Sequence, residues 1–207
     1  SNFLKTSATV TVLKIMVPNI KLQVPEGESK ILLHSCCAPC SSAILEALLN
    51  NGITPVIYYY NPNIYPQEEY EIRKAENKRY AESLGVEFID GDYNYEKWRE
   101  CAIGLESEPE RGGRCYKCFF KRLTSSAEMA SKLGIKVITT TLASSRWKDF
   151  NQIIAAGRAA CEAIPNVVFW EQNWRKGGLY DRRNELLKEL KFYNQQYCGC
   201  EFSRGKL

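Results

Sequence analysis

The chain has 207 residues, a length typical of one domain or of one domain with an appendage. Hydrophobic residues make up 44% and charged residues 25%, which is typical of a folded globular protein and argues against a disordered or fibrous one. The net charge of +4 permits a polyanionic partner without requiring one. The longest stretch without a charge, residues 47–67, contains three prolines and four asparagines, so we expect no membrane-spanning helix.

Strand-like and helix-like segments alternate along the first half of the chain. An apolar run at 30–34 leads directly into cysteines, and residues 39–50 begin with proline and end before an Asn-Gly pair. These features predict a strand, a turn and a helix. A second strand is expected at 54–60, a charged helix at 67–84 and a third strand at 85–90.

The same alternation continues to the end of the chain. Further helices are expected at 94–104, 119–132, 149–162 and 181–191, a cysteine loop at 115–118, and strands at 135–140 and 166–170. Five strands separated by helices predict a three-layer α/β fold with a parallel, Rossmann-like or HUP-like sheet. We expect one catalytic domain at 29–207 with a short cysteine-bearing C-terminal extension. Residues 1–28 form an N-terminal arm, an edge strand or a loose segment, to which we assign no function.

Nine cysteines, an odd number, argue against a fully paired secreted framework. With no export signal evident, we expect a reducing cytoplasm and thiols used for metal or redox chemistry. Residues 36–40 (CCAPC) lie at a predicted helix start, where the amide dipole lowers thiol pKa values and favours soft-metal binding. These cysteines directly follow the first predicted strand. They therefore lie at the carboxyl edge of the sheet, where ligands bind in such folds.

Two further cysteine motifs lie later in the chain. The two-residue gap at 115–118 (CYKC) allows two sulfurs to bind one metal or cluster, with a thioredoxin-like redox pair as the competing interpretation. The pair at 198–200 (CGC) can flank one metal or cycle as a strained disulfide bond, and the spacing does not decide between these. Cys101 and Cys161 have apolar neighbours and are interpreted as packing residues.

Seven thiols remain for chemistry. A zinc site uses four of them, whereas an iron–sulfur cluster together with a second metal or redox pair uses all seven.

The cysteine motifs occur in order with three others, and together they resemble the QueH-type epoxyqueuosine reductases from about residue 30 to 203. The six matching segments are residues 34–40 (HSCCAPC), 60–73 (YNPNI, then Glu69, Tyr70 and Arg73), 114–118 (RCYKC), 139–144 (TTTLAS), 175–180 (RKGGLY) and 197–203 (YCGCEFS). This family reduces epoxyqueuosine, at the wobble position of the tRNA anticodon, to queuosine without cobalamin. The resemblance therefore implies an oxidoreductase whose partner is tRNA carrying epoxyqueuosine.

The resemblance also implies a [4Fe–4S] cluster beside a second metal ion, either iron or zinc. Matched position by position, the cluster ligands would be Cys36, Cys37, Cys115 and Cys118. The remaining thiols are expected at the adjacent metal or redox site, where they are the catalytic candidates: Cys40, Cys198 and Cys200. Removal of an epoxide oxygen requires two electrons and a leaving oxide, so a Lewis-acidic metal beside an electron source is chemically reasonable.

Polar and basic residues near these motifs are candidates for substrate binding. The set comprises Asn61, Asn63, Thr140, Arg146, Arg175 and Lys176, with Thr139 and Thr141 as further hydroxyls at the same strand end. Two basic groups favour phosphate contacts over a merely solvated face: Arg111, Arg114, Lys117, Lys121 and Arg122, then Arg175, Lys176, Arg182 and Arg183. Trp147, Trp174 and Tyr180 either stack on a flipped base or pack in the core. His34, the single histidine, is interpreted as structural rather than metal-binding.

Two other functions compete with this interpretation. The first is an ATP-pyrophosphatase-like iron–sulfur tRNA sulfurtransferase, although residues 36–40 lack the phosphate-binding glycines that such an enzyme needs. The second is a zinc-stabilised RNA-binding module without catalytic activity.

Overall fold

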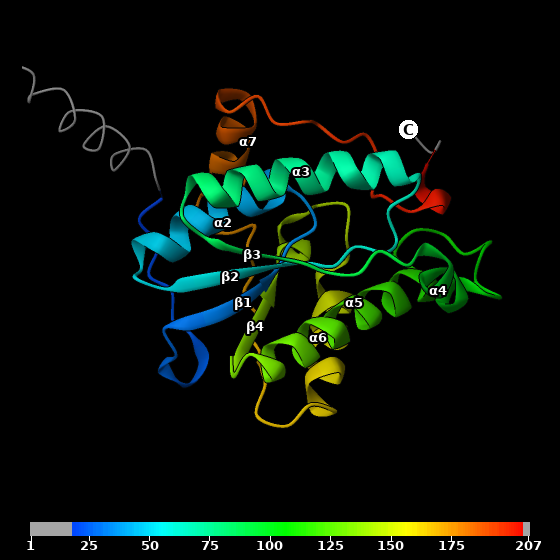
Figure 1. Ribbon diagram of the computed structural model, residues 1–207, viewed down its shortest axis with the longest axis horizontal. Helices are drawn as coiled ribbons and strands as arrows, with labels where there is room; N and C mark the ends of the chain where they lie inside the picture. Colours follow the sequence, from blue (N-terminus) through cyan, green and yellow to red (C-terminus); the bar gives the residue numbers. More distant parts are fainter. Residues whose placement is uncertain (1–17, 205–207) are drawn as a thin grey trace, which may run out of the picture.

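The computed structural model describes residues 18–204 and contains one five-stranded parallel sheet in the order β3-β2-β1-β4-β5 (Figure 1). The strands are β1 (Lys30–His34), β2 (Thr54–Tyr59), β3 (Glu87–Asp90), β4 (Val137–Thr140) and β5 (Val168–Phe169). Every neighbouring pair is parallel, and His34 aligns with both Tyr58 and Thr140. The predicted α/β class and all five predicted strands are confirmed.

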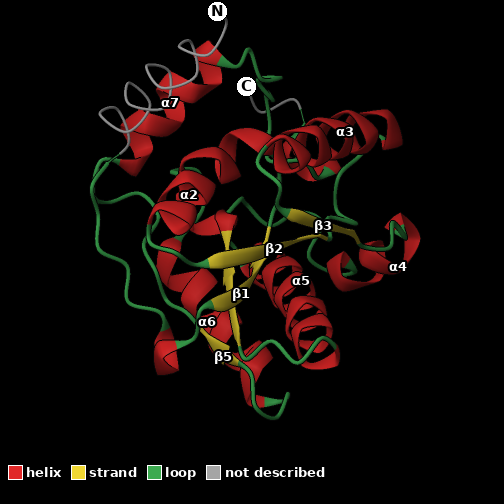
Figure 2. Cartoon of the chain, turned by 60° about the vertical axis from the view of Figure 1, so that its left-hand side comes forward, coloured by secondary structure: helices red, strands yellow, loops and turns green. Residues whose placement is uncertain are grey.

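Helices cover both faces of the sheet, which completes the three layers. On one face lie α2 (Ala38–Asn50), α3 (Gln67–Ser83) and α7 (Leu179–Glu189), and on the other lie α5 (Gly113–Lys132) and α6 (Phe150–Glu162) (Figures 1 and 2). The short helix α4 (Tyr95–Arg99) lies beside α5. None of the described helices combines the length and the apolar character that crossing a bilayer requires.

Burial on both faces explains the continuous apolar sequence of β1. Ile31 and Leu33 pack in the core formed with α2 and α7, whereas Leu32 faces the α5 side. A strand covered on both sides needs apolar residues at successive positions, not at alternate ones. Trp174 belongs to the first core and is 1% exposed. Its indole donates to Thr139 Oγ1, so core packing is the correct interpretation for this tryptophan.

Helix α5 begins at Gly113, six residues before its predicted start, so the predicted loop at 115–118 is wrong. Both cysteines of the CYKC motif lie on the first turns of this helix. The side chain of Glu108 accepts a hydrogen bond from the Arg114 amide at 3.2 Å, which satisfies a free N–H of the first turn. Glu108 precedes the helix and is not at the N-cap position, where capping residues are normally sought. The sequence alone therefore did not reveal that α5 begins at Gly113.

The helix predicted at 94–104 is also shorter than expected. Helix α4 ends at Arg99, a 3-10 turn follows at Glu100–Ala102, and Gly104 has a positive φ of 80°. The described part of the predicted N-terminal arm, residues 18–28, forms no strand, and Ile20, Leu22 and Val24 pack against the core. The alternating residues 9–12 lie outside the described residues.

Candidate active site

The candidate site lies where two adjacent strands of the sheet send the chain to opposite faces. Strand β1 continues into α2 on one face, whereas β4 continues through a 3-10 turn (Thr141–Ser144) towards α6 on the other (Figure 1). Such a switch point leaves a crevice at the carboxyl ends of the strands. The Cys36 amide donates to Thr141 Oγ1 at 3.0 Å, which joins the two loops. The predicted location of the first cysteine motif is therefore confirmed.

Three buried thiols gather directly after β1. The sulfurs of Cys36, Cys37 and Cys40 all lie within 4.8 Å of one another. In the part of the chain that the structure describes, no other set of three or more His, Cys, Asp or Glu side chains is grouped so closely. Because the donors are thiols and no carboxylate belongs to the group, this trio suits a soft metal such as iron or zinc and not calcium or magnesium. We call these residues the thiol trio.

The thiol trio favours one negative charge, not three. Hydrogen bonds from Cys37 and Cys40 lower the pKa of Cys36 well below its ordinary value. Burial raises the pKa of Cys37, and the hydrogen bond with Cys36 raises the pKa of Cys40 to about 11. The expected lowering of thiol pKa values is therefore found for Cys36 but not for Cys37 and Cys40, because one buried thiolate suppresses the next. Binding of a metal by all three would release protons.

The CYKC motif faces the same edge of the sheet from the opposite helical layer. Cys115 packs against the cluster that contains the thiol trio, and burial raises its pKa to about 12. Cys118 is buried beside Trp98 and Cys200. The α5 helix thus links the first cysteine motif to the last one.

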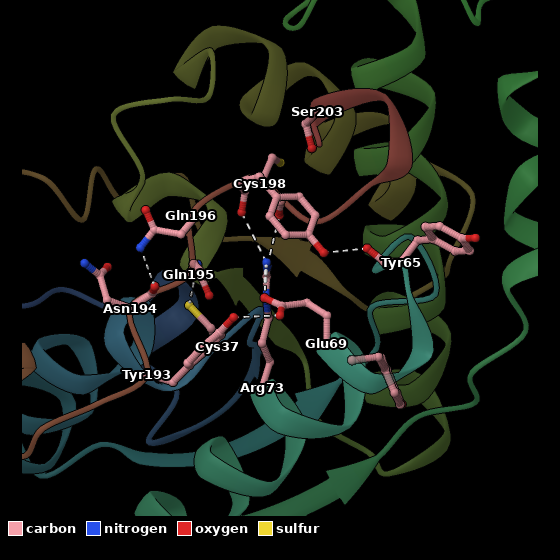
Figure 3. A network of polar contacts seen from close by, with 12 residues as sticks. Cys37, Tyr65, Glu69, Arg73, Tyr193, Asn194, Gln195, Gln196, Cys198 and Ser203 are labelled. Carbon is pink, nitrogen blue, oxygen red and sulfur yellow. Dashed lines mark hydrogen bonds and ion pairs between the residues drawn. The ribbon is translucent and has the colours of Figure 1, made fainter. Parts of the chain in front are cut away.

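The C-terminal Cys198-Gly199-Cys200 segment is held against α3 by Arg73 (Figure 3). The Arg73 guanidinium donates to the carbonyls of Tyr197 and Cys198, each at 3.2 Å, and its Nε donates to Glu69 at 2.8 Å. Both side chains of this ion pair are less than 10% exposed. Tyr193 Oη donates to the second Glu69 oxygen at 2.7 Å, so the carboxylate is satisfied on both sides.

Glycine is required in the middle of this segment. Gly199 has a φ of 132°, and a Cβ there would lie 3.2 Å from both Arg73 Nη1 and Ile64 Cγ1. Its carbonyl accepts a hydrogen bond from the Tyr65 amide at 2.8 Å. The backbone can therefore pass close to α3 only because this position carries no side chain.

Beyond the cysteines, the segment is anchored on the α4 side. Glu201 contacts Tyr95 Oη and the Nε of Arg99, the latter at 2.5 Å. The Phe202 ring lies 4.9 Å from the guanidinium of Arg99 and 4.6 Å from that of Arg114. The thiols of Cys198 and Cys200 are thus fixed between two anchors and complete the gathering of all seven cysteines around one edge of the sheet.

A cavity of about 260 Å³ opens beside the thiol trio. The lining includes Cys40, Trp147, Tyr180 and Arg183, and no Asp or Glu is among its described lining residues. A smaller adjoining cavity is lined by Cys115, Cys198 and Cys200. Trp147 and Lys148 line both cavities, so this dipeptide lies between the two groups of thiols.

Lys148 is the functional candidate that the sequence analysis missed. Its side chain is 8% exposed. Burial opposes its charge, but the electrostatic effect of the neighbouring thiols of Cys198, Cys36 and Cys40 outweighs burial and raises the pKa of Lys148. Arg183 provides a second cation near Cys40, and its pKa is also raised despite burial. The available signal for Lys148 was its position next to Arg146 and Trp147, both of which the sequence had indicated.

Several predicted substrate residues have their polar groups engaged within the protein. The Asn61 amide donates to the Ser35 carbonyl and accepts from Arg122, and Thr140 Oγ1 bonds His34 at 2.8 Å. Asn63 is 2% exposed, and its Oδ1 has no partner among the described residues. Of the two asparagines, only Asn63 thus retains a free acceptor.

His34 is a structural residue, as the sequence analysis favoured. Burial, reinforced by the charge of Arg122, lowers its pKa to about 3. The neutral ring donates from Nε2 to the Tyr60 carbonyl at 3.0 Å, and Nδ1 accepts from Thr140. Both ring nitrogens are therefore occupied, and neither is available to a metal.

The predicted basic groups divide into buried and accessible members. Arg114, Arg122 and Arg182 are each no more than 2% exposed, so their expected phosphate contacts are wrong. Arg175 is half-buried and donates to the Lys148 carbonyl at 2.8 Å, and Arg111 holds the carbonyls of Arg146 and Trp147. Three other predicted cations are exposed, namely Lys117, Arg146 and Lys176. They come from the two basic groups and from the predicted substrate-binding set.

The predicted aromatic residues also divide. Trp147 is 50% exposed at the rim of the cavity, which leaves its ring available for stacking. Tyr180 lines the same cavity beneath the Arg146 guanidinium, 3.6 Å from the ring centre. These two rings, unlike the buried Trp174, can contact a ligand.

Comparison with known proteins gives a consistent result across most of the chain. A family model described as epoxyqueuosine reductase QueH matches residues 31–206. Epoxyqueuosine reductase QueH from Haemophilus influenzae is 51% identical over 183 residues, which cover 88% of this chain and 75% of that protein. The Acinetobacter baylyi protein of the same name is 48% identical, with 90% and 85% covered. The Thermotoga maritima protein is 34% identical, with 84% and 89% covered.

Proposed function

The chain belongs to the QueH family of epoxyqueuosine reductases and is therefore an oxidoreductase, and from this premise we propose that it reduces the epoxide of epoxyqueuosine in tRNA to give queuosine. The observation that carries the proposal is the gathering of seven thiols in two neighbouring clusters at one sheet edge, beside a cavity with no Asp or Glu among its described lining residues. The overall change adds two electrons and two protons, converts the epoxide to an alkene and releases water.

The thiols fit an iron–sulfur cluster and a neighbouring metal or dithiol. We assign Cys36, Cys37, Cys115 and Cys118 to a [4Fe–4S] cluster, because Cys115 packs against the hydrophobic cluster that contains Cys36 and Cys37, and Cys118 follows it one turn later on α5. When bound, this cofactor supplies electrons one at a time, and a second metal, iron or zinc, supplies a Lewis acid. The set contains soft sulfur donors, as both groups require.

The second centre is assigned to Cys40, Cys198 and Cys200. Cys40 faces the larger cavity, and the other two face the smaller one. As metal ligands they would hold an ion beside the substrate, and as a dithiol Cys198 and Cys200 would release two electrons and two protons on closing a disulfide. All nine cysteines are free thiols in this structure, so either use is open to the pair.

The larger cavity is the proposed nucleoside site. Lys148 and Arg183 contribute positive charge at its wall, where negative charge develops on the departing epoxide oxygen. Trp147 and Tyr180 offer aromatic surfaces for a base extruded from the anticodon loop. Asn63, whose buried Oδ1 has no partner among the described residues, remains a proposed contact for a substrate hydroxyl beside Gly199.

The tRNA backbone is the proposed partner of the surface around this cavity. Lys117, Arg146 and Lys176 are exposed and are the proposed phosphate contacts, since such cations supply affinity without reading sequence. Arg175 acts indirectly by holding the Lys148 carbonyl. The family assignment decides against both the sulfurtransferase and the noncatalytic zinc module as the function of the chain.

Cysteine replacement tests the ligand set. We expect Cys36→Ser, Cys37→Ser, Cys115→Ser and Cys118→Ser each to lose iron and sulfide, because oxygen is a poor ligand for this cluster. Anaerobic iron and sulfide analysis and absorbance at about 400 nm measure the loss. Cys161→Ser is the matched control, because Cys161 is buried in the core on the α6 side.

Nucleoside analysis of treated tRNA completes this experiment. The parental protein and the Cys161→Ser control should convert epoxyqueuosine to queuosine. Full iron and sulfide in any of the four variants would remove that cysteine from the ligand set, and a parental protein without iron would overturn the cluster assignment.

A further inference from the structure

Each sulfur assigned to the cluster accepts a hydrogen bond from a neighbouring group. Cys36 accepts from Thr141 Oγ1 at 3.3 Å and Cys37 from Gln195 Nε2 at 3.2 Å. Cys115 accepts from the Arg111 amide and Cys118 from the Trp98 indole, each at 3.3 Å. Donors from four separate parts of the chain therefore converge on the four assigned ligands.

Trp98 is a fully buried side-chain donor. It lies on α4, is 1% exposed, and packs against Tyr95 and Phe202 with ring centres 5.7 and 6.5 Å away. The Cys118 sulfur is the one partner of its indole N–H among the described residues. An unpaired buried N–H would be costly, so this hydrogen bond is well determined.

Gln195 approaches from the opposite end of the site. It belongs to the segment between α7 and the C-terminal cysteines, and its amide N–H points to the Cys37 sulfur (Figure 3). The Oε1 of Gln195 has no partner among the described residues. The hydrogen bond from Nε2 to the Cys37 sulfur is therefore what orients the amide. The neighbouring Gln196 points elsewhere and donates to the Asn194 carbonyl.

We propose that Trp98 and Gln195 are positioning residues that set the reduction potential of the cluster by donating hydrogen bonds to its Cys118 and Cys37 ligands. The inference rests on the proposed cluster ligands. A cluster that gains an electron carries more negative charge on its sulfurs, and an N–H dipole aimed at sulfur stabilises that state more than the oxidised one. Removal of either donor should therefore shift the potential to more negative values.

The first test compares two buried tryptophans in anaerobically purified holoprotein. Trp98→Phe removes an N–H that faces sulfur, whereas Trp174→Phe removes one that faces Thr139 Oγ1. With the solution held at the parental midpoint potential, the ratio of reduced to oxidised cluster in Trp98→Phe should be lower by about threefold or more. For a one-electron couple, a tenfold change in this ratio corresponds to 59 mV. Trp174→Phe should retain the parental ratio.

The second test uses the adjacent glutamines, because Trp98→Phe also changes core packing. Gln195→Leu should lower the same ratio, and Gln196→Leu should not. Iron and sulfide content is measured in all four variants. Parental potentials in both Trp98→Phe and Gln195→Leu, with full clusters, would overturn the inference. Cluster loss confined to Trp98→Phe would make Trp98 a structural residue and overturn its tuning role. Absence of a cluster from the parental protein would instead overturn the proposed function on which the inference rests.

Discussion

At the scale of single residues, the most consequential charge outside the thiols is that of Arg73. A buried guanidinium is tolerated because each of its three nitrogens donates to an acceptor, namely Glu69 or the carbonyl of Tyr197 or Cys198. Its role is to hold backbone, which places two thiols without touching either sulfur. We therefore regard Arg73 as a positioning residue.

We expect Arg73→Met to loosen the C-terminal cysteine segment and lower the free energy of unfolding by about 3 kcal/mol, because the buried Glu69 carboxylate loses its cation. The rate at which a maleimide labels Cys198 should rise, and mass spectrometry measures it. Arg79→Met is the control, since Arg79 lies on the same helix with its side chain 67% exposed. Unchanged labelling of Cys198 would show that the segment does not depend on Arg73.

Residue types and spacings predicted the thiols and the structural role of His34. They did not predict Lys148 or Trp98, because neither belongs to a spacing pattern that distinguishes it from a surface lysine or a core tryptophan. What makes these residues notable is the sulfur that the fold brings next to them, Cys198 for Lys148 and Cys118 for Trp98. Such long-range neighbours exist only after the sheet and its helices have assembled.

At the scale of elements, strands were predicted more accurately than helix ends. Apolar runs locate buried strands directly, whereas the start of α5 depends on Glu108, and the end of α4 on a 3-10 turn. The early start of α5 matters for function, because three residues along a helix place Cys115 and Cys118 on the same side. A loop would have left the direction of the two sulfurs undetermined.

The C-terminal segment is the element whose removal should separate cofactor content from activity. We expect Cys198→Ala or Cys200→Ala to abolish epoxide reduction while iron and sulfide remain at parental levels, because these thiols belong to the proposed second centre. The readouts are nucleoside analysis and metal content, with Cys101→Ala as a control outside both assigned sets. Parental turnover by either variant would contradict the two-centre assignment, and cluster loss in both would mean that the seven thiols are divided differently.

At the scale of the whole molecule, sequence counts overstated the basic surface. Runs of Lys and Arg predicted two phosphate-binding groups, but several of these arginines are buried. Arg182, for example, pairs with Glu46 at 3.0 Å. Burial of cations cannot be read from local composition, since only the fold shows which arginines find acceptors inside: Arg182 pairs with the distant Glu46 as well as with Glu185 and Glu189 on its own helix. The parallel sheet, by contrast, followed from the alternation of elements alone.

Salt dependence of tRNA binding tests the exposed cations. Lys117→Gln combined with Lys176→Gln should flatten the plot of log affinity against log salt by about one to two units, as each lost phosphate contact releases about one counterion fewer. Lys132→Gln, at the other end of α5, is the control and should leave the slope unchanged. A parental slope in the double variant would exclude these lysines from the tRNA interface.

The position of the assigned ligands on opposite helical layers has a consequence for the motions of the protein. Cys36 and Cys37 precede α2, whereas Cys115 and Cys118 belong to α5 on the other face. A cofactor bound to both pairs would act as a cross-link through the edge of the sheet, so the two layers could not separate while all four bonds persisted. Amide protons of β1 and β4, which lie between these layers, should then exchange with deuterium much more slowly in the loaded protein than in the cofactor-free one.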